Sequence, residues 1–323
     1  MSTTHPTADT VAVIGAGTIG LSWAALFAAH GLQVRVTDPR PDLAEAVDAA
    51  LAEAAPQLAR RGLDTAGLAD RVHLAGDVTE AVRHADVVQE NGPENTAVKR
   101  ELFAQLVREA PPHAVLLSSS SAIPATAFTD GLDDAGRILI GHPFNPPHLV
   151  PLVEVVPGRR THEDVVTRAV EFYRSVGRVP VVERKEIPGF VGNRLQNALS
   201  REAIHLVEQG VVGPSELDAI VVNSLGLRWS TVGPFLGAHL GGGPGGYRHM
   251  AEHLGPSMQQ LWDSLGRPEH SPERTERLIR AVEDAYGSRS YRDLGQERDR
   301  KQLAVLGALE NATAHEQNEE TRS

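Results

Sequence analysis

The chain has 323 residues, of which 41% are hydrophobic and 23% charged, and its formal net charge is −11. This balance is typical of a globular protein with two domains, and such an acidic chain lacks the basic surface of a nucleic-acid-binding protein. The absence of cysteine excludes disulfides, thiolate nucleophiles and cysteine-bound zinc. We find no apolar run of the ~20 residues that cross a bilayer and no secretory signal, so we expect a cytoplasmic protein without membrane partners.

The first part of the chain alternates short β-branched runs with alanine-rich helical segments. The expected strands are residues 11–14, 34–37, 86–89, 114–118, 137–141, 152–156 and 179–182. Helical periodicity is clearest in residues 21–31, 43–62 and 96–110. Strands separated by helices of this length predict an α/β fold of Rossmann type, with a mostly parallel sheet covered on both faces.

A glycine-rich motif, GAGTIG, follows the first expected strand and precedes the first expected helix. Gly15, Gly17 and Gly20 have the G-x-G-x-x-G spacing of a dinucleotide-binding loop. The first glycine permits a tight turn, the second lets the backbone approach a pyrophosphate, and the third lets the helix pack closely on the strand. The helix would begin near Thr18 and Ile19, whose free N–H groups face the phosphates. The alternative is a glycine-rich turn that binds no nucleotide.

An acidic residue ends the second expected strand at the position where such folds bind a ribose. Asp38 lies eighteen residues after Gly20 and can accept hydrogen bonds from the adenosine ribose hydroxyls. Because a 2′-phosphate would be repelled there, we predict NAD rather than NADP as the cofactor. The neighbouring Arg40 favours the opposite choice.

Three later stretches carry polar groups where strands should end: LLSSSSAIP, GHPFNPPHLVPLVE and KEIPGFVGNRLQ. Ligands of open α/β sheets bind outside the carboxyl ends of the strands, where residues 118–121 and His142 are expected. If the strands on either side of the proline-rich loop pair, His142 and Glu154 face each other within about 5 Å. The carboxylate would then orient the imidazole as a general base. A histidine held by backbone groups in a rigid turn explains the spacing equally well.

The character of the chain changes near residue 188, after which helical periodicity dominates. We therefore expect an NAD-binding domain at 1–187 and an all-helical domain at 188–312, with a disordered polar tail at 313–323. Asn193 lies off the apolar stripe of the first helix in the second domain. Its amide either reaches the cleft between the domains or caps the helix.

In order and spacing, GAGTIG, SSSSAIP, HPFNPP, PLVEVVP and KEIPGFVGNRLQ resemble the 3-hydroxyacyl-CoA dehydrogenase family. QENGPENTAVKRELF, LVEQGVVGPSELD and GLRWSTVGPF are most similar to its lambda-crystallin branch, which includes L-gulonate 3-dehydrogenase, and to the related L-carnitine dehydrogenases. The resemblance implies NAD-dependent oxidation of an L-3-hydroxyl group to a 3-keto group. It also implies a homodimer formed through the helical domain.

The resemblance also implies roles for individual residues. His142 matches the general base and Glu154 its orienting carboxylate, while Ser121 and Asn193 match the groups that hydrogen-bond the substrate oxygens. We further expect Glu94 and Lys99 to contact the cofactor, and Ser119 and Asn145 to contact the substrate. No metal is implied.

One departure from the family affects the expected substrate. Ser119 and Ser120 stand where the acyl-CoA enzymes usually carry asparagine and threonine. The helical region after Asp38, which could hold the phosphates of CoA, has Arg60, Arg61 and Arg71 but no lysine in a strongly acidic chain. We therefore favour a small free 3-hydroxy acid, such as L-gulonate or L-carnitine, over a 3-hydroxyacyl-CoA. Arg228 is then a candidate for a bidentate carboxylate contact, with a surface salt bridge as the alternative.

Two interpretations from other functional classes remain. HMAEH at 249–253 fits the H-x-x-E-H pattern of certain zinc peptidases, although a chain with 14 histidines produces such a match easily by chance. The other interpretation is a non-catalytic protein of the crystallin kind that keeps the fold without turnover. The presence of all four expected catalytic residues argues against it.

Overall fold

The computed structural model describes residues 8–269 and 271–320, which form two compact units. The first unit ends at Arg194 and the second begins at Leu195. The change of unit therefore falls seven residues later than the boundary expected after residue 187. The reason is that the helix starting at Phe190 begins inside the first unit, where its first N–H groups bond to buried carboxylates of the sheet.

The first unit is built on one eight-stranded sheet in the order β3-β2-β1-β4-β5-β6-β7-β8. Every neighbouring pair of strands is parallel except β6 and β7, which confirms the mostly parallel sheet. The strands are β1 (Thr10–Ile14), β2 (Gln33–Thr37), β3 (Val72–Leu74), β4 (Val87–Glu90), β5 (Val115–Ser118), β6 (Ile138–Pro143), β7 (Leu152–Pro157) and β8 (Val179–Val182).

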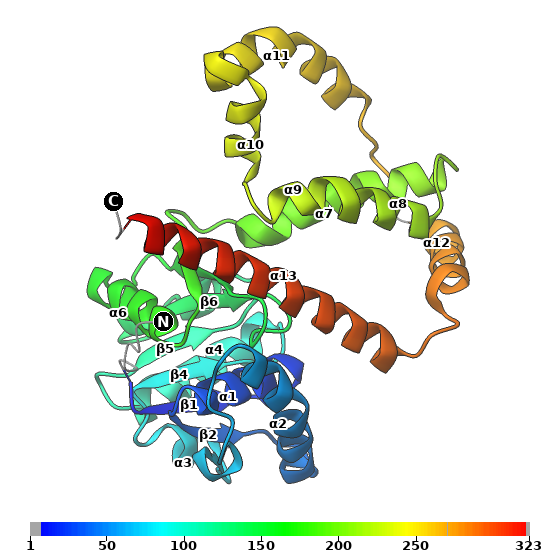
Figure 1. Cartoon of the computed structure of the whole chain (residues 1–323). Coiled ribbons are helices and arrows are strands. Elements are labelled where there is room, and N and C mark those ends of the chain that lie inside the picture. The colour runs from blue at the N-terminus through cyan, green and yellow to red at the C-terminus, as the bar shows by residue number, and fades with distance from the viewer. Residues whose placement is uncertain (1–7, 270, 321–323) are drawn as a thin grey trace. The chain divides into compact units, whose positions relative to one another are not determined.

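Helices cover both faces of this sheet (Figure 1). They are α1 (Thr18–Ala29), α2 (Leu43–Arg60), α3 (Val78–Val82), α4 (Thr96–Glu109), α5 (Ala125–Thr129) and α6 (Glu163–Ser175), with 3-10 turns η1 (Ala69–Arg71) and η2 (Ala135–Arg137). The alternation of side chains along β1 divides the core. Val11 and Val13 pack with α1, α2 and α6, whereas Ala12 and Ile14 pack with α3, α4 and α5. Both layers are therefore apolar, as a buried parallel sheet requires.

The second unit is helical, as the sequence predicted. Helix α7 (Phe190–Glu208) continues into it from the first unit, and the elements that follow are α8 (Pro214–Val221), the π-helical turn η3 (Val222–Gly226), α9 (Leu227–Trp229), α10 (Pro234–Gly241), the 3-10 turn η4 (Gly243–Gly245), α11 (Gly246–Ser264), α12 (Pro272–Tyr286) and α13 (Tyr291–Glu320). Of the helices that the structure describes, none carries a stretch of residues apolar enough to span a bilayer.

The polar tail differs from the expectation. Residues 313–323 were expected to be disordered, but α13 extends to Glu320. This segment contains neither glycine nor proline, and alanine, glutamate and glutamine favour a helix even where no apolar face is available. Residues 321–323 lie outside the described part of the chain.

Candidate active site

The glycine loop has the backbone that a dinucleotide-binding turn needs. Gly15 has a φ of +94°, in the left-handed region, and its N–H donates to the carbonyl of Thr37 at 2.9 Å. A Cβ on Gly20 would lie 1.9 Å from the carbonyl oxygen of Gly15, so the close contact of helix and loop requires glycine at that position. A Cβ on Gly17 would meet nothing within 4 Å. The fold itself therefore explains two of the three glycines, and the third is left for an approaching ligand.

These differences give a matched pair of expected results. Gly20→Ala forces a methyl group into the backbone and should destabilise the first unit by roughly 3 kcal/mol. Gly17→Ala should leave the melting temperature within about 2 °C of the parent, but should raise the KM for NAD about tenfold, because the new methyl group stands where the pyrophosphate approaches. Thermal melting and NAD titration measure the two effects. Equal destabilisation by both variants would contradict the assignment.

The start of α1 is suited to hold a phosphate group. No side chain caps the helix at Gly17, and its first turn contains no acidic residue. The backbone N–H groups of Thr18 and Ile19 stand in that first turn, where an α-helix leaves its donors unpaired. Asp38, directly after β2, accepts the N–H of Ala16 at 2.7 Å, which places its carboxylate beside the loop. These residues fit NAD, which would bring its pyrophosphate to the helix and a ribose to the carboxylate.

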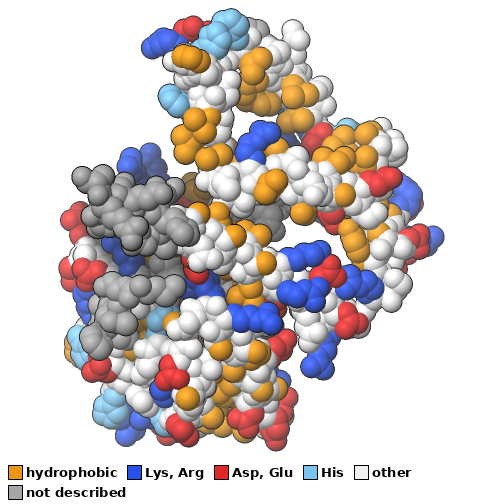
Figure 2. All heavy atoms as spheres, viewed as in Figure 1, with side chains coloured by type: hydrophobic (Ala, Val, Ile, Leu, Met, Phe, Trp, Pro, Cys, Tyr) orange, Lys and Arg blue, Asp and Glu red, His pale blue; other side chains and the backbone are white. Residues whose placement is uncertain are grey.

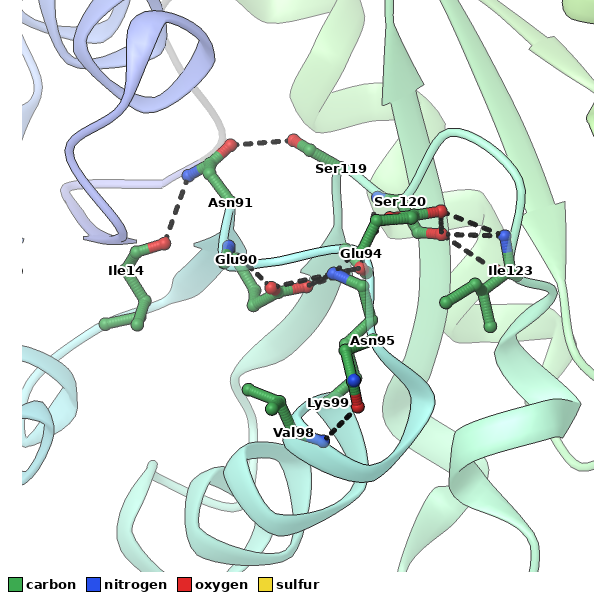
Figure 3. A network of polar contacts seen from close by, with 12 residues as sticks. Ile14, Glu90, Asn91, Glu94, Asn95, Val98, Lys99, Ser119, Ser120 and Ile123 are labelled. Carbon is green, nitrogen blue, oxygen red and sulfur yellow. Dashed lines mark hydrogen bonds and ion pairs between the residues drawn. The ribbon is translucent and has the colours of Figure 1, made fainter. Parts of the chain in front are cut away.

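The four consecutive serines have different environments. The hydroxyl of Ser118 donates to Glu90, and that of Ser120 donates to Glu94 at 2.7 Å. Ser119 donates to Asn91 at 2.7 Å (Figure 3). It also accepts from the side chains of Trp23 and Gln89. These three hydroxyls therefore stabilise the turn after β5, and the expected contact of Ser119 with a substrate stays a prediction.

Glu94 and Lys99 lie directly below this turn (Figure 3). One oxygen of Glu94 accepts the backbone N–H groups of residues 121–123 at 2.8–3.2 Å, while the side chain remains 37% exposed. Lys99 is 1% exposed, and its ammonium group lies 2.9 Å from both carboxylate oxygens of Glu90. The charge of Lys99 is therefore paired with Glu90 inside the protein, and its expected contact with the cofactor stays a prediction.

Ser121 is the exposed member of the serine run, and its hydroxyl makes no hydrogen bond within the described residues. Its backbone carbonyl accepts the side-chain amide of Asn193, in the first turns of α7, at 2.7 Å. The structure thus brings together two residues that the sequence separates by 72 positions. The expected contact of Asn193 with a substrate stays a prediction.

The register of the antiparallel pair places His142 on β6 directly opposite Glu154 on β7. The Nδ1 atom of His142 lies 2.7 Å from a carboxylate oxygen of Glu154, and both residues are at least 95% buried. The rings of Phe144 and Phe190 stand 5.2 and 5.5 Å from the imidazole. Because the carboxylate accepts a hydrogen bond from Nδ1–H, Nε2 carries the lone pair that a general base needs.

The other oxygen of Glu154 accepts the backbone N–H of Gly192 at 2.6 Å. Burial alone would raise the pKa of the Glu154 carboxyl, but the hydrogen bonds from His142 and from Gly192, together with the neighbouring Glu183 side chain, outweigh it and hold the pKa below its ordinary value. Glu154 therefore stays ionised beside the imidazole, as an orienting carboxylate must.

Gly192 and Glu183 were not predicted from the sequence. A Cβ on Gly192 would lie 2.3 Å from the ring of Phe144, so glycine is required where α7 approaches Glu154. Glu183 follows β8 and is 7% exposed. The sequence did carry a signal for Gly192, because a glycine inside a helical pattern commonly marks the close approach of another segment to the helix.

Asn145 is exposed in the loop after β6, and Arg228 is exposed on α9 in the second unit. The expected contact of each residue with a substrate stays a prediction. The HMAEH motif is on α11, where the rings of His249 and His253 lie 4.1 Å apart. Among the side chains that the structure describes, no group of three could ligate a metal ion.

The arrangement is suited to proton removal from an alcohol. A buried imidazole with an available Nε2, a hydroxyl at Ser121 and an amide at Asn193 lie in the same unit as the dinucleotide loop. These are the components that oxidation of a secondary alcohol by hydride transfer requires.

Comparison with known proteins agrees with this chemistry. An L-carnitine dehydrogenase of Streptomyces griseus subsp. griseus is 42% identical over 92% of this chain and 89% of its own length. A 3-hydroxyacyl-CoA dehydrogenase of Gibberella moniliformis is 40% identical over 93% and 94% of the two chains. The crystal structure of an NAD+-dependent dismutase, FHMPC 5-dehydrogenase, matches with a TM-score of 0.81 and 32% identity over 94% of this chain and 98% of that one.

Two family models cover most of the chain. The NAD binding domain of 3-hydroxyacyl-CoA dehydrogenase matches residues 10–187, and the C-terminal domain of the same enzymes matches residues 189–279. The fold, the cofactor and the class of enzyme predicted from the motifs are thereby confirmed. This NAD-dependent oxidoreductase belongs to the 3-hydroxyacyl-CoA dehydrogenase family.

Proposed function

We propose that this protein is an L-carnitine dehydrogenase, which oxidises the 3-hydroxyl group of L-carnitine to a ketone with NAD. The observation that carries the chemistry is the buried hydrogen bond between His142 and Glu154, which leaves Nε2 of the imidazole to accept a proton. The relatives named L-carnitine dehydrogenase, at 38–42% identity over nearly the whole chain, support the choice of substrate.

In this proposal, His142 removes the hydroxyl proton while hydride leaves C3 of the substrate. NAD, when bound, supplies the acceptor for that hydride. The hydroxyl of Ser121 and the amide of Asn193 donate hydrogen bonds to the substrate oxygen as it becomes a carbonyl. Glu154 stabilises the imidazolium that forms, and its lowered pKa prevents it from taking the proton itself.

A substrate panel tests the proposal. Initial rates of NADH formation should give a kcat/KM for L-carnitine at least about a hundredfold above those for D-carnitine, L-gulonate and 3-hydroxybutyrate. A preference for 3-hydroxybutyryl-CoA would instead support the alternative suggested by the acyl-CoA dehydrogenase relative. No turnover of any panel member would support a non-catalytic protein.

We also propose that the protein forms a homodimer through the second unit. Large apolar side chains are exposed on the paired helices α10 and α11, where Figure 2 shows them grouped on the viewed face. The most exposed are Phe235, Leu236, Leu240, Leu254, Leu261 and Trp262, at 51–76%. Large apolar side chains exposed in number commonly mark an interface between proteins, and a second copy is the partner that the family resemblance implies.

A further inference from the structure

Three side chains on neighbouring strands share one face of the sheet. His142 on β6 pairs with Glu154 on β7, and Glu154 pairs in turn with Val181 on β8. Glu183 lies two residues after Val181, and its N–H extends the parallel ladder by donating to Val155 at 2.9 Å. Because side chains alternate along a strand, Glu183 points to the same side as Glu154. The row of His142 and Glu154 therefore continues to a second carboxyl group.

The two carboxyl groups also share the start of α7. Val191 donates its N–H to one oxygen of Glu183 at 2.8 Å, and Gly192 donates its N–H to Glu154 at 2.6 Å. The second oxygen of Glu183 is buried and has no hydrogen-bond donor within the described residues. A buried carboxylate oxygen without a donor is a rare feature that requires an explanation.

A proton on Glu183 provides that explanation. Two ionised carboxylates in contact in a buried site repel each other, so one of them holds a proton. Burial, together with the neighbouring Glu154, raises the pKa of the Glu183 carboxyl, whereas hydrogen bonds lower that of Glu154. A protonated Glu183 turns its unpartnered oxygen into a donor, and Glu154 is the acceptor beside it.

We propose that Glu183 is a positioning residue that holds a proton at neutral pH and donates a hydrogen bond to Glu154, so that His142 faces one negative charge rather than two. The inference deepens the proposed dehydrogenase function and rests on it. The donor from Glu183 fixes the orientation of the Glu154 carboxylate and limits its basicity, which keeps the transferred proton on the imidazole.

The groups that face Glu183 determine its pH dependence. Glu154 faces it from β7, His142 from β6, and α7 presents the backbone N–H of Val191. Because the folded-state pKa is raised, the contribution of Glu183 to stability is fully present below its unfolded pKa. That contribution is lost as the pH rises through the folded pKa. Glu183→Gln removes this ionisation, so its melting temperature relative to the parent should be higher at pH 9 than at pH 5.

Infrared difference spectroscopy on the full chain tests the proton directly and does not depend on the substrate. The parent at pH 7 should show the carbonyl stretch of a protonated carboxyl group, shifted in D2O, and Glu183→Gln should lose it. Glu171→Gln, at an exposed carboxyl on α6, is the matched control and should retain the band. If the parent lacks the band, or if Glu183→Gln retains it, the inference is overturned even when carnitine oxidation is confirmed.

Kinetics then separate positioning from a merely structural role. The amide of Glu183→Gln can still donate to Glu154, so kcat should stay within about threefold of the parent, whereas Glu183→Leu should lose roughly 10- to 100-fold in kcat with an unchanged KM for NAD. In the parent, kcat should fall at alkaline pH as Glu183 ionises. This fall should be absent in Glu183→Gln. An equal loss in both variants would contradict the role of the hydrogen bond. If Glu183→Leu does not fold, the infrared test and the pH profile of Glu183→Gln still test the proposed proton on Glu183.

Discussion

Replacement of His142 by asparagine is expected to lower kcat for carnitine oxidation by roughly 10²- to 10⁴-fold, the usual contribution of a general base. Asparagine can still donate a hydrogen bond to Glu154, which also keeps the hydrogen bond from the N–H of Gly192. The site should therefore remain folded. It offers no group that can accept a proton from the substrate. The dissociation constant for NAD should be nearly unchanged, because the glycine loop and Asp38 are separate from the dyad.

The protein offers a matched control for this variant. His113 and Asp86 form a histidine–carboxylate pair at 3.1 Å on the surface of the same unit, with the histidine side chain 60% exposed. His113→Asn should leave kcat and the KM values unchanged. Parent-like turnover in His142→Asn, or an equal loss in both variants, would remove the dyad from the mechanism.

Replacement of Lys99 by methionine is expected to destabilise the first unit by about 3–5 kcal/mol, the usual effect of removing one partner from a buried ion pair. Lys99 and Glu90 are 1% and 0% exposed, and the carboxylate would keep only its bonds to Gly92 and Ser118. Adding Glu90→Gln to the variant should recover much of the loss, because no buried charge then remains. The turn with the four serines should regain its position at the same time.

Urea unfolding measures this effect in the first unit. The chain has three tryptophans, and Trp23 is fully buried in the core of the sheet domain. With Trp229 and Trp262 replaced by phenylalanine, the fluorescence of Trp23 reports the first unit alone. Lys185→Met is the matched control, since Lys185 is exposed, and should change the free energy of unfolding by less than about 0.5 kcal/mol. A loss of similar size in both variants would contradict a buried pair.

The sequence alone predicted the features that depend on the local pattern of residues and on the pairing of β6 with β7. Seven of the strands were visible as β-branched runs, and the opposition of His142 and Glu154 required only that β6 and β7 pair around the proline-rich loop. β3 was not predicted, because its three residues, VHL, form no apolar run and two of them are exposed. Short edge strands of this kind leave little signal in composition.

The features that were not predicted depend on contacts between distant segments. Nothing in SSSS distinguishes the three hydroxyls bound within the turn from the exposed Ser121, since their partners lie about 30 residues earlier. Lys99 did have a local signal, because it shares the buried stripe of α4 with Phe103 and Leu106. A lysine on such a stripe indicates a buried partner rather than a surface contact. Glu183 had no such local signal, because its burial depends on the approach of α7 to the end of β8.

In the proposed reaction, the protein transfers a hydride from C3 of L-carnitine to NAD while His142 takes the hydroxyl proton. The most direct measurement uses L-carnitine deuterated at C3 and follows the label by mass spectrometry of the NADH formed. We predict that the parent transfers deuterium to the nicotinamide, and that His142→Asn loses this transfer while still binding NAD. Unlabelled NADH from the parent, or undiminished transfer in His142→Asn, would contradict the account.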